Sequence, residues 1–233
     1  MADDVYRPMM SDDEAATLRR WHEAASIDLH RLGAHQVHYL GLDLVVPEHV
    51  FPPAPMSELL GRAVLDEVCD GDRVLDMGTG SGVNAILAAS RSRDVVGVDV
   101  NPQAVKAAVA NAERNNVASR TAFLDSDLFE RVEGTFDLVV FDPPFRWFRP
   151  RDLLEVAFAD EDYRTLTMFM SDVGDRLRPG GRVLMFFGTS GDMNYLRHLI
   201  DKHDFCSDTI ASRALTKDGV TVTYFALRLT KAR

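Results

Sequence analysis

Short apolar runs alternate with helical patterns along most of the chain after residue 72. Seven runs have the length and composition of buried strands, at residues 73–77, 94–98, 121–124, 136–141, 182–187, 209–214 and 221–229. Helical patterns cover residues 83–90, 102–115, 162–177 and 193–202. Because strands that alternate with helices connect in parallel, the pattern predicts an α/β fold with a seven-stranded, mostly parallel sheet and helices on both faces.

The end of the chain departs from this alternation. Only residues 215–219 separate the last two predicted strands, which is too short for a crossover helix. The sheet is therefore expected to end in an antiparallel hairpin. Before the fifth strand, Pro179, Gly180 and Gly181 predict a turn, since glycine readily adopts a positive φ.

The beginning of the chain predicts a helix. Ser11 followed by Glu14 has the pattern of a capping box, in which each side chain binds the backbone N–H of the other residue. Apolar residues then recur at helical spacing from Leu18 onward, and Gly33 is a plausible stop.

A different pattern follows that helix. Residues 39–46 predict a hairpin or an edge strand, and the prolines of residues 47–55 predict an ordered loop or a lid, because proline cannot donate to a strand ladder. A further helix is expected over residues 56–68. We therefore expect an N-terminal extension, residues 1–55, ahead of one α/β domain, residues 56–233.

Composition narrows the class of protein. The chain has 233 residues, of which 46% are hydrophobic. No apolar run approaches the roughly 20 residues that span a bilayer, and the N-terminus lacks the pattern of a signal peptide, so a cytoplasmic protein is expected. Cys69 and Cys206 have no neighbour at metal-ligand spacing and are predicted to be reduced, buried thiols.

The formal net charge of −10 bears on the partners of the protein. Nucleic acids bind through Lys and Arg side chains that neutralise phosphates, so a nucleic acid is a disfavoured partner. Arg146, Arg149 and Arg151 are the exception, either as a local basic patch or as a solvated loop. No metal site is expected, because the histidines near the N-terminus have no carboxylate or cysteine at ligand spacing. These histidines are His22, His30, His35 and His38.

A glycine-rich turn follows the first predicted strand. Residues 74–82 read Val-Leu-Asp-Met-Gly-Thr-Gly-Ser-Gly, and a helix is expected next. Glycines let the backbone approach a ligand closely, and the start of a helix offers free N–H groups to an anionic group. Asp99 ends the next strand, at the spacing of about 20 residues where a carboxylate binds the ribose hydroxyls of an adenosine. A nucleoside-containing cofactor is therefore predicted, with Asp76 placed to attract an amino group of that cofactor, directly or through water.

The third predicted strand is followed by another candidate cofactor element. Asp127 is expected to accept the exocyclic amine of an adenine, while Leu128 or Phe129 covers a face of the ring. A nicotinamide dinucleotide is the alternative ligand, because residues 80–85 also fit the glycine pattern of dinucleotide enzymes. A carboxylate at the mouth of the turn would repel a pyrophosphate, which favours a phosphate-free cofactor.

The fourth predicted strand opens directly into Asp142, Pro143, Pro144 and Phe145. Ligands bind beyond the carboxyl ends of strands in open α/β sheets. The nitrogen of an amide, a guanidine or a nucleobase amine is a poor nucleophile because its lone pair is delocalised. If the Asp142 carboxylate and the Pro143 carbonyl each accept one N–H, the lone pair turns toward the electrophile, while Phe145 stacks on the planar group. The alternative is a proline turn that only closes the strand.

These motifs resemble those of the class I S-adenosylmethionine-dependent methyltransferases of the small-domain group, especially the HemK-type glutamine N5-methyltransferases that modify translation release factors. The resemblance covers about residues 39–229 and includes the entrance segment from Val50 to Pro53. A Rossmann-like sheet that ends in a hairpin is typical of this class. The resemblance implies S-adenosyl-L-methionine as the cofactor and N-methylation of a protein side chain or a small molecule. HemK-type enzymes carry Asn where this chain has Asp142, and Asp is more typical of enzymes that methylate nucleobase amines.

The motifs and the resemblance together define the expected site. The expected catalytic residues are Asp142, Pro143, Pro144 and Phe145. The expected cofactor-binding residues are Asp76, Gly78, Thr79, Gly80, Gly82, Asn84, Asp99, Val100, Asn101, Asp127, Leu128 and Asp142. Three other functions stay open: methylation of rRNA or tRNA base amines, nicotinamide-dependent oxidoreduction, and cofactor binding without catalysis.

Overall fold

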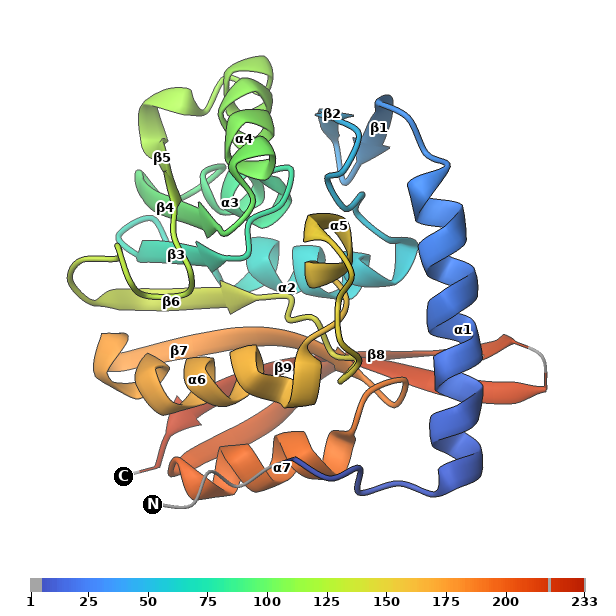
Figure 1. Ribbon diagram of the computed structural model, residues 1–233. Helices are drawn as coiled ribbons and strands as arrows, with labels where there is room; N and C mark the ends of the chain where they lie inside the picture. The colour runs from blue at the N-terminus through green and yellow to red at the C-terminus, as the bar shows by residue number, and fades with distance from the viewer. Residues whose placement is uncertain (1–5, 218, 233) are drawn as a thin grey trace.

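A computed structural model, which describes residues 6–217 and 219–232, contains one large sheet (Figure 1). Its strand order is β5-β4-β3-β6-β7-β9-β8. The strands are β3 (Arg73–Met77), β4 (Asp94–Asp99), β5 (Thr121–Asp125), β6 (Phe136–Phe141), β7 (Leu177–Gly188), β8 (Phe205–Lys217) and β9 (Val220–Lys231). Neighbours are parallel from β5 to β7, whereas β9 is antiparallel to both β7 and β8. The predicted Rossmann-like fold, with its terminal hairpin, is confirmed.

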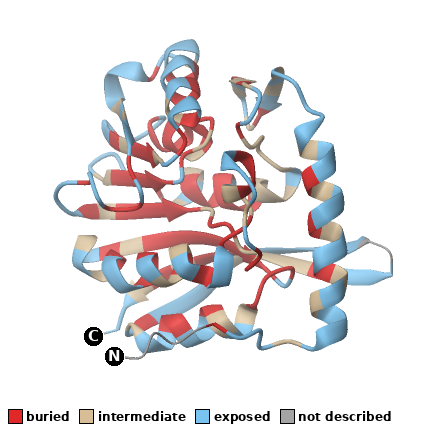
Figure 2. Cartoon of the chain, in the orientation of Figure 1, coloured by how far each residue is buried: buried red, intermediate tan, exposed pale blue. Residues whose placement is uncertain are grey.

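Helices cover both faces of this sheet. One face carries α2 (Glu58–Glu67), α3 (Val83–Ala88) and α4 (Pro102–Arg114), and the other carries α6 (Arg164–Asp172) and α7 (Met193–Lys202). Successive residues of a strand point to opposite faces, so Leu138 and Val140 pack toward α2 and α3, while Val139 and Phe141 pack toward α6. Burial on both faces explains why the central strands β3 and β6 read as continuous apolar runs, whereas the edge strands β5 and β8 are largely exposed (Figure 2).

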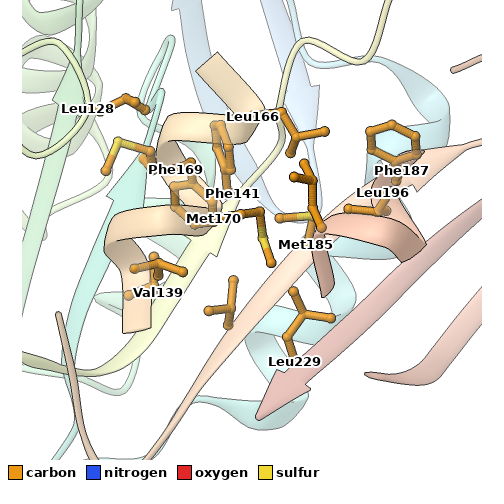
Figure 3. Close-up of a cluster of buried hydrophobic side chains, with 14 of the residues drawn as sticks. Leu128, Val139, Phe141, Leu166, Phe169, Met170, Met185, Phe187, Leu196 and Leu229 are labelled. Atoms are coloured by element: carbon orange, nitrogen blue, oxygen red, sulfur yellow. The ribbon is translucent and has the colours of Figure 1, made fainter. Parts of the chain in front are cut away.

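The core beneath α6 is rich in large side chains (Figure 3). Phe141 lies 4.3 Å from Phe169, measured between ring centroids, and Met170 and Met185 fill the space beside them. This packing fixes the carboxyl end of β6, because Phe141 is its last residue. The loop that begins at Asp142 therefore starts from a rigid point.

The start of β7 and the ends of α6 differ from the prediction. The turn at Gly180 is a bulge inside β7, because Phe136 pairs with Leu177 and Leu138 pairs with Arg182, which leaves residues 178–181 outside the register. The helix predicted over residues 162–177 is α6 with a short 3₁₀ turn at each end. Hydrophobic periodicity does not distinguish these tighter turns from an α-helix.

The N-terminal residues pack against the sheet domain. Helix α1 (Asp12–His30) begins with the predicted capping box, in which Ser11 N–H donates to Glu14 over 3.0 Å. Strands β1 (His35–Tyr39) and β2 (Leu42–Val46) form a hairpin, whose first strand lies mostly outside the predicted range. Helix α1 and the short α5 (Leu153–Val156) both lie beyond the carboxyl ends of β3 and β6 (Figure 1).

The prediction of buried cysteines is wrong. Cys69 lies in the turn between α2 and β3, and Cys206 lies on β8, the edge strand of the sheet; both are exposed. A turn and a sheet edge leave a short apolar side chain without covering atoms. Within the described ranges, no helix combines the length and apolar character needed to cross a membrane, and no group of three or more potential ligands is arranged to hold a metal ion.

Candidate active site

A cavity of about 470 Å³ lies at the carboxyl ends of the parallel strands. We call one part the glycine-turn end; it is lined by residues 78–81, 99–101 and 126–128. We call the other part the proline-turn end; it is lined by Ser57, residues 142–146, Phe186 and Tyr224. The cavity thus brings together most of the predicted site residues, namely Gly78, Thr79, Gly80, Asn84, Asp99, Val100, Asn101, Asp127, Leu128, Asp142, Pro143, Pro144 and Phe145.

The glycine turn depends on two glycines in different ways. Gly80 has φ 54°, and a Cβ there would meet nothing within 4 Å, so its backbone faces open cavity. Gly82 has φ 90°, and a Cβ there would lie 3.0 Å from the Cα of Ala108 in α4. Gly80 leaves room for a ligand, whereas Gly82 allows α3 and α4 to pack closely and is not part of the cavity wall.

Asp76 lies beneath the turn and does not line the cavity. Its carboxylate is 1% exposed and accepts the Thr79 hydroxyl over 2.6 Å and the Ala85 N–H over 3.0 Å. Burial raises the pKa of Asp76 to about 7. Asp76 Oδ2 therefore braces the turn, whereas Oδ1 is buried and has no hydrogen-bond partner among the described residues. The predicted attraction of a cofactor amino group to Asp76, directly or through water, stays a prediction. The sequence predicts that N–H groups at the start of α3 are free to bind an anionic ligand. One of them, the Ala85 N–H, donates to Asp76 instead.

Asp99 joins the turn to the end of β4. Its two carboxylate oxygens accept N–H groups from Gly80 and from Asn101, each over 2.8 Å. Burial raises the pKa of Asp99 above its ordinary value. Asn101 in turn caps α4 by accepting the Gln103 N–H over 3.0 Å and donates to the carbonyl of His49 over 3.0 Å. These bonds hold one carboxylate at the cavity wall.

The loop after β5 completes the glycine-turn end. Asp127 is exposed at the rim of the cavity, and the buried Leu128 lines it. Phe129 instead stacks on Phe169 in the core, with 5.7 Å between ring centroids. Of the two side chains considered for covering an adenine ring, only Leu128 is in position.

Asp142 is the polar group at the centre of the proline-turn end. It accepts the Ser57 hydroxyl over 3.0 Å. Burial raises the pKa of Asp142 to about 7, and the bond from Ser57 opposes this rise. Sequence reasoning missed Ser57 because Ser57 and Asp142 are 85 residues apart along the chain. Ser57 also lies in the short turn before α2, where serine is an ordinary helix-start residue.

The backbone after Asp142 is fixed from two sides. The Phe145 carbonyl accepts the Tyr163 hydroxyl over 2.7 Å, and that hydroxyl also accepts the Asp192 N–H over 2.7 Å. A Cβ on Gly191 would lie 2.3 Å from the same carbonyl, so only glycine fits there. The Phe145 ring lines the cavity and lies 5.5 Å from the ring of Phe187. A rigid turn therefore presents Asp142 and Phe145 to the cavity.

The predicted proline-rich loop forms part of the cavity wall. Residues 49–54 line the cavity, and Phe51 lies 5.6 Å from Phe158 between ring centroids. Ala25 and Leu29 of α1, with Leu153 of α5, line the same region. The entrance segment and α1 thus form a roof over the carboxyl ends of the strands.

The roof is held to the domain by a buried carboxylate. Glu155 is 0% exposed and accepts bonds from the Arg151 side chain, the Arg151 N–H and the Ser26 hydroxyl. Although burial acts to raise it, the pKa of Glu155 is held at about 2 by these bonds. Ser26 belongs to α1 and Glu155 to α5, so this cluster connects the two helices.

The three arginines of the predicted basic patch do not act together. Arg151 is bound to Glu155, and Arg149 has a side chain that is 81% exposed and lies 3.9 Å from Glu161. Arg146 alone lines the cavity. Of the three arginines, only Arg146 therefore faces the cavity, and the choice between a basic patch and a solvated loop stays a prediction.

Comparison with known sequences agrees with this geometry. The family model for the methyltransferase small domain matches residues 55–201. The release factor glutamine methyltransferase of Geobacter sulfurreducens is 29% identical over 184 residues, which cover 72% of this chain and 63% of that protein. A Methanocaldococcus jannaschii protein with the provisional name protein N5-glutamine methyltransferase is 43% identical over 106 residues, which cover 45% of this chain and 52% of that protein. The chain spans between half and two thirds of the length of these two relatives.

Solved structures share the fold at low sequence identity. The tRNA m1G37 methyltransferase of M. jannaschii has a TM-score of 0.65 at 17% identity, covering 87% of this chain and 58% of that chain. A 16S rRNA methyltransferase of T. thermophilus, solved in complex with AdoMet and guanosine, has a TM-score of 0.60 at 24% identity, covering 86% of this chain and 50% of that chain. These likenesses concern the fold alone. By its family match, the chain belongs to the methyltransferase small domain family, which confirms the class of S-adenosylmethionine-dependent methyltransferases that its motifs predicted.

Proposed function

We propose that this chain is an S-adenosylmethionine-dependent N-methyltransferase that acts on a planar nitrogen. One observation carries the proposal: a carboxylate, Asp142, is held in a rigid proline turn and faces the cavity that the glycine turn also lines. The names of the relatives favour the amide nitrogen of a glutamine side chain in a protein as the acceptor. A guanidine or a small metabolite would fit the same geometry. The cytoplasm is the proposed compartment, since both cysteines are unpaired.

The glycine-turn end fits this cofactor. Bound S-adenosylmethionine supplies a methyl group on a positively charged sulfur. Asp99 would bind the ribose hydroxyls, Asp127 would accept the adenine amine, and Leu128 would cover the ring. No Lys or Arg from the described residues lines this end, which suits a phosphate-free, cationic nucleoside better than a dinucleotide with its pyrophosphate.

The proline-turn end would orient the acceptor. The Asp142 carboxylate and the Pro143 carbonyl would each accept one N–H, so the nitrogen lone pair, which is perpendicular to the plane of the group, would point toward the methyl and localise on the nitrogen. Phe145 packs on the planar group. After transfer, Asp142 is positioned to take the surplus proton from the nitrogen, and its raised pKa of about 7 suits it to hold that proton near neutral pH.

A nucleobase amine is the second candidate acceptor, because Asp rather than Asn stands at position 142. The net charge of −10 works against it, and so does a cavity wall with one arginine among its described residues, since nucleic-acid binding depends on several cations. Absent or salt-insensitive RNA binding would remove this candidate.

Calorimetry and label transfer together test the proposal. We expect S-adenosylhomocysteine to bind the wild-type protein and the Asp142→Ala variant alike, and only the wild-type protein to transfer labelled methyl groups to a protein extract. A wild-type protein that binds neither S-adenosylmethionine nor S-adenosylhomocysteine contradicts the proposal. Tight binding of a reduced nicotinamide cofactor would replace it with an oxidoreductase.

A further inference from the structure

The proline-turn end contains a guanidinium that has no counter-ion among the residues the structure describes. Arg146 lines the cavity, and its Nη1 is a buried atom with no hydrogen-bond partner among the described residues. The residue itself is firmly placed, because its carbonyl accepts the Asp160 N–H over 2.8 Å and its backbone bridges to Ala159. Burial lowers the pKa of Arg146, yet arginine remains protonated in proteins. A fixed positive charge therefore faces the cavity.

No neighbouring group in the described part of the chain neutralises this charge. The side chains that interact with it electrostatically are Tyr163, Tyr224 and His22. Burial raises the pKa of Tyr163, and burial together with Arg146 lowers the pKa of His22 to about 4, so both are neutral near pH 7. A guanidinium with a buried, unpaired nitrogen is costly for a fold. Its presence in a cavity wall indicates that a ligand supplies the anion.

The composition of the cavity wall narrows the kind of anion. Arg146 is the only Lys or Arg that lines the cavity within the described ranges. One guanidinium matches one carboxylate through two parallel hydrogen bonds. A phosphate dianion or a nucleic-acid backbone would require further cations, and the nearby Arg149 and Arg151 point to other partners.

Resting on the proposed function, we propose that the methyl acceptor carries a carboxylate, which Arg146 binds while Asp142 holds the nitrogen to be methylated. The carboxylate belongs either to a small acid that also bears the planar nitrogen or to an acidic side chain beside the acceptor residue of a protein. Arg146 is thus a specificity-determining residue, because it selects acceptors that carry a carboxylate. Its substitution is expected to weaken acceptor use and to leave cofactor binding unchanged.

The experiment measures methyl-label transfer by the wild-type protein, Arg146→Gln, Arg146→Lys and the matched control Arg149→Gln. Separate metabolite and protein fractions of a cell extract serve as acceptors, each used untreated, treated with phosphatase, or treated with a carbodiimide and ethanolamine to convert carboxylates into neutral amides. For the wild-type protein, we expect carboxylate blocking to reduce labelling at least about 30-fold and phosphatase to have no effect. The fraction that is labelled, metabolite or protein, identifies the source of the carboxylate.

The variants separate this inference from the proposed function. Arg146→Gln should reduce labelling of the untreated fraction at least about 30-fold, Arg146→Lys should restore part of it, and Arg149→Gln should match the wild-type protein. Equal labelling by Arg146→Gln and wild type, labelling that survives carboxylate blocking, or labelling that phosphatase abolishes would overturn the inference alone. A parallel loss of S-adenosylhomocysteine binding in Arg146→Gln would also overturn it, because the guanidinium would then hold the cofactor. No labelling by a wild-type protein in any fraction contradicts the proposed function itself.

Discussion

The two ends of the cavity differ in how far the protein satisfies the charged groups that point into them. At the glycine-turn end, Asp99 accepts two backbone N–H groups, and Asn101 both caps α4 and donates to His49. At the proline-turn end, Asp142 accepts one bond, from Ser57, and Arg146 Nη1 has no partner within the described residues. The Asp99 carboxylate is held in place before a ligand arrives, whereas Asp142 and Arg146 retain hydrogen-bonding capacity for a ligand to fill. Ser81 Oγ, which is buried without a partner among the described residues, is an exception at the glycine-turn end.

The largest expected effect comes from a substitution at the proline-turn end. Asp142→Ala removes the carboxylate that accepts an N–H from the acceptor, and we expect kcat to fall by about 10²–10³. The dissociation constant of S-adenosylhomocysteine should change less than about threefold, because the glycine-turn end is untouched. Label transfer measures the first quantity and calorimetry the second.

Asp142→Asn is the matched control for this substitution. It keeps one accepting oxygen and the shape of the side chain, so we expect a smaller loss than for Asp142→Ala. If both variants retained more than about a tenth of wild-type turnover, the carboxylate would have no part in orienting the nitrogen.

The second-largest expected effect comes from a substitution at the glycine-turn end. Asp99→Ala removes the proposed ribose contact and leaves the N–H groups of Gly80 and Asn101 without their acceptor, so we expect the dissociation constant of S-adenosylhomocysteine to rise roughly 10- to 100-fold. Asp125→Ala, at the exposed end of β5, is the control and should bind normally. Equal affinities for the two variants would argue against a cofactor role of Asp99.

A smaller effect concerns the pH dependence of turnover. Because burial raises the pKa of Asp142 to about 7, the accepting carboxylate form is lost as the pH falls below 7, and kcat should fall with it. Ser57 stabilises the carboxylate form, so Ser57→Ala should move this acid limb upward by about one pH unit. Ser57→Thr keeps the hydroxyl and should keep the wild-type profile. An acid limb that is identical in Ser57→Ala would show that another group titrates.

The smallest effect concerns stability. Arg146→Met replaces an unpaired buried charge by an apolar side chain of similar length, so we expect the free energy of unfolding without ligand to rise by about 1 kcal/mol. Denaturant unfolding measures this, with Arg149→Met as a control that should stay within about 0.5 kcal/mol of wild type. A clear loss of stability in Arg146→Met would mean that the guanidinium has a partner in the fold.

The sequence predicts those features that depend on neighbours along the chain. The buried strands, the glycine turn after β3 and the capping box at Ser11 are each encoded within about ten residues, and the structure contains them. The convergence of Asp99, Asp127 and Asp142 was also predictable, because the carboxyl ends of adjacent parallel strands meet at one edge of a sheet.

Features that depend on tertiary packing could not be predicted in this way. Ser57 meets Asp142 only because α2 begins beside β6, and the exposure of Cys206 follows from its place on the edge strand. The position of Asp76 below the turn rather than in the cavity wall depends on the rotation of α3 over β3. Local patterns identify which residues are polar and near the site, but not which of them face the ligand.

The buried Glu155 bears on how the pH dependence of turnover is interpreted. Since the pKa of Glu155 is held at about 2, its connection between α1 and α5 stays ionised throughout the range in which the enzyme would be assayed. Acidification from pH 8 to pH 5 therefore leaves the bonds of Glu155 in place. The second bond between the two helices, from His30 to Asp152, behaves differently, because it is an ion pair only while His30 is protonated and it raises the pKa of His30. A pH–rate profile for this protein therefore reports Asp142, which faces the reactants, together with the His30–Asp152 pair, and not Glu155.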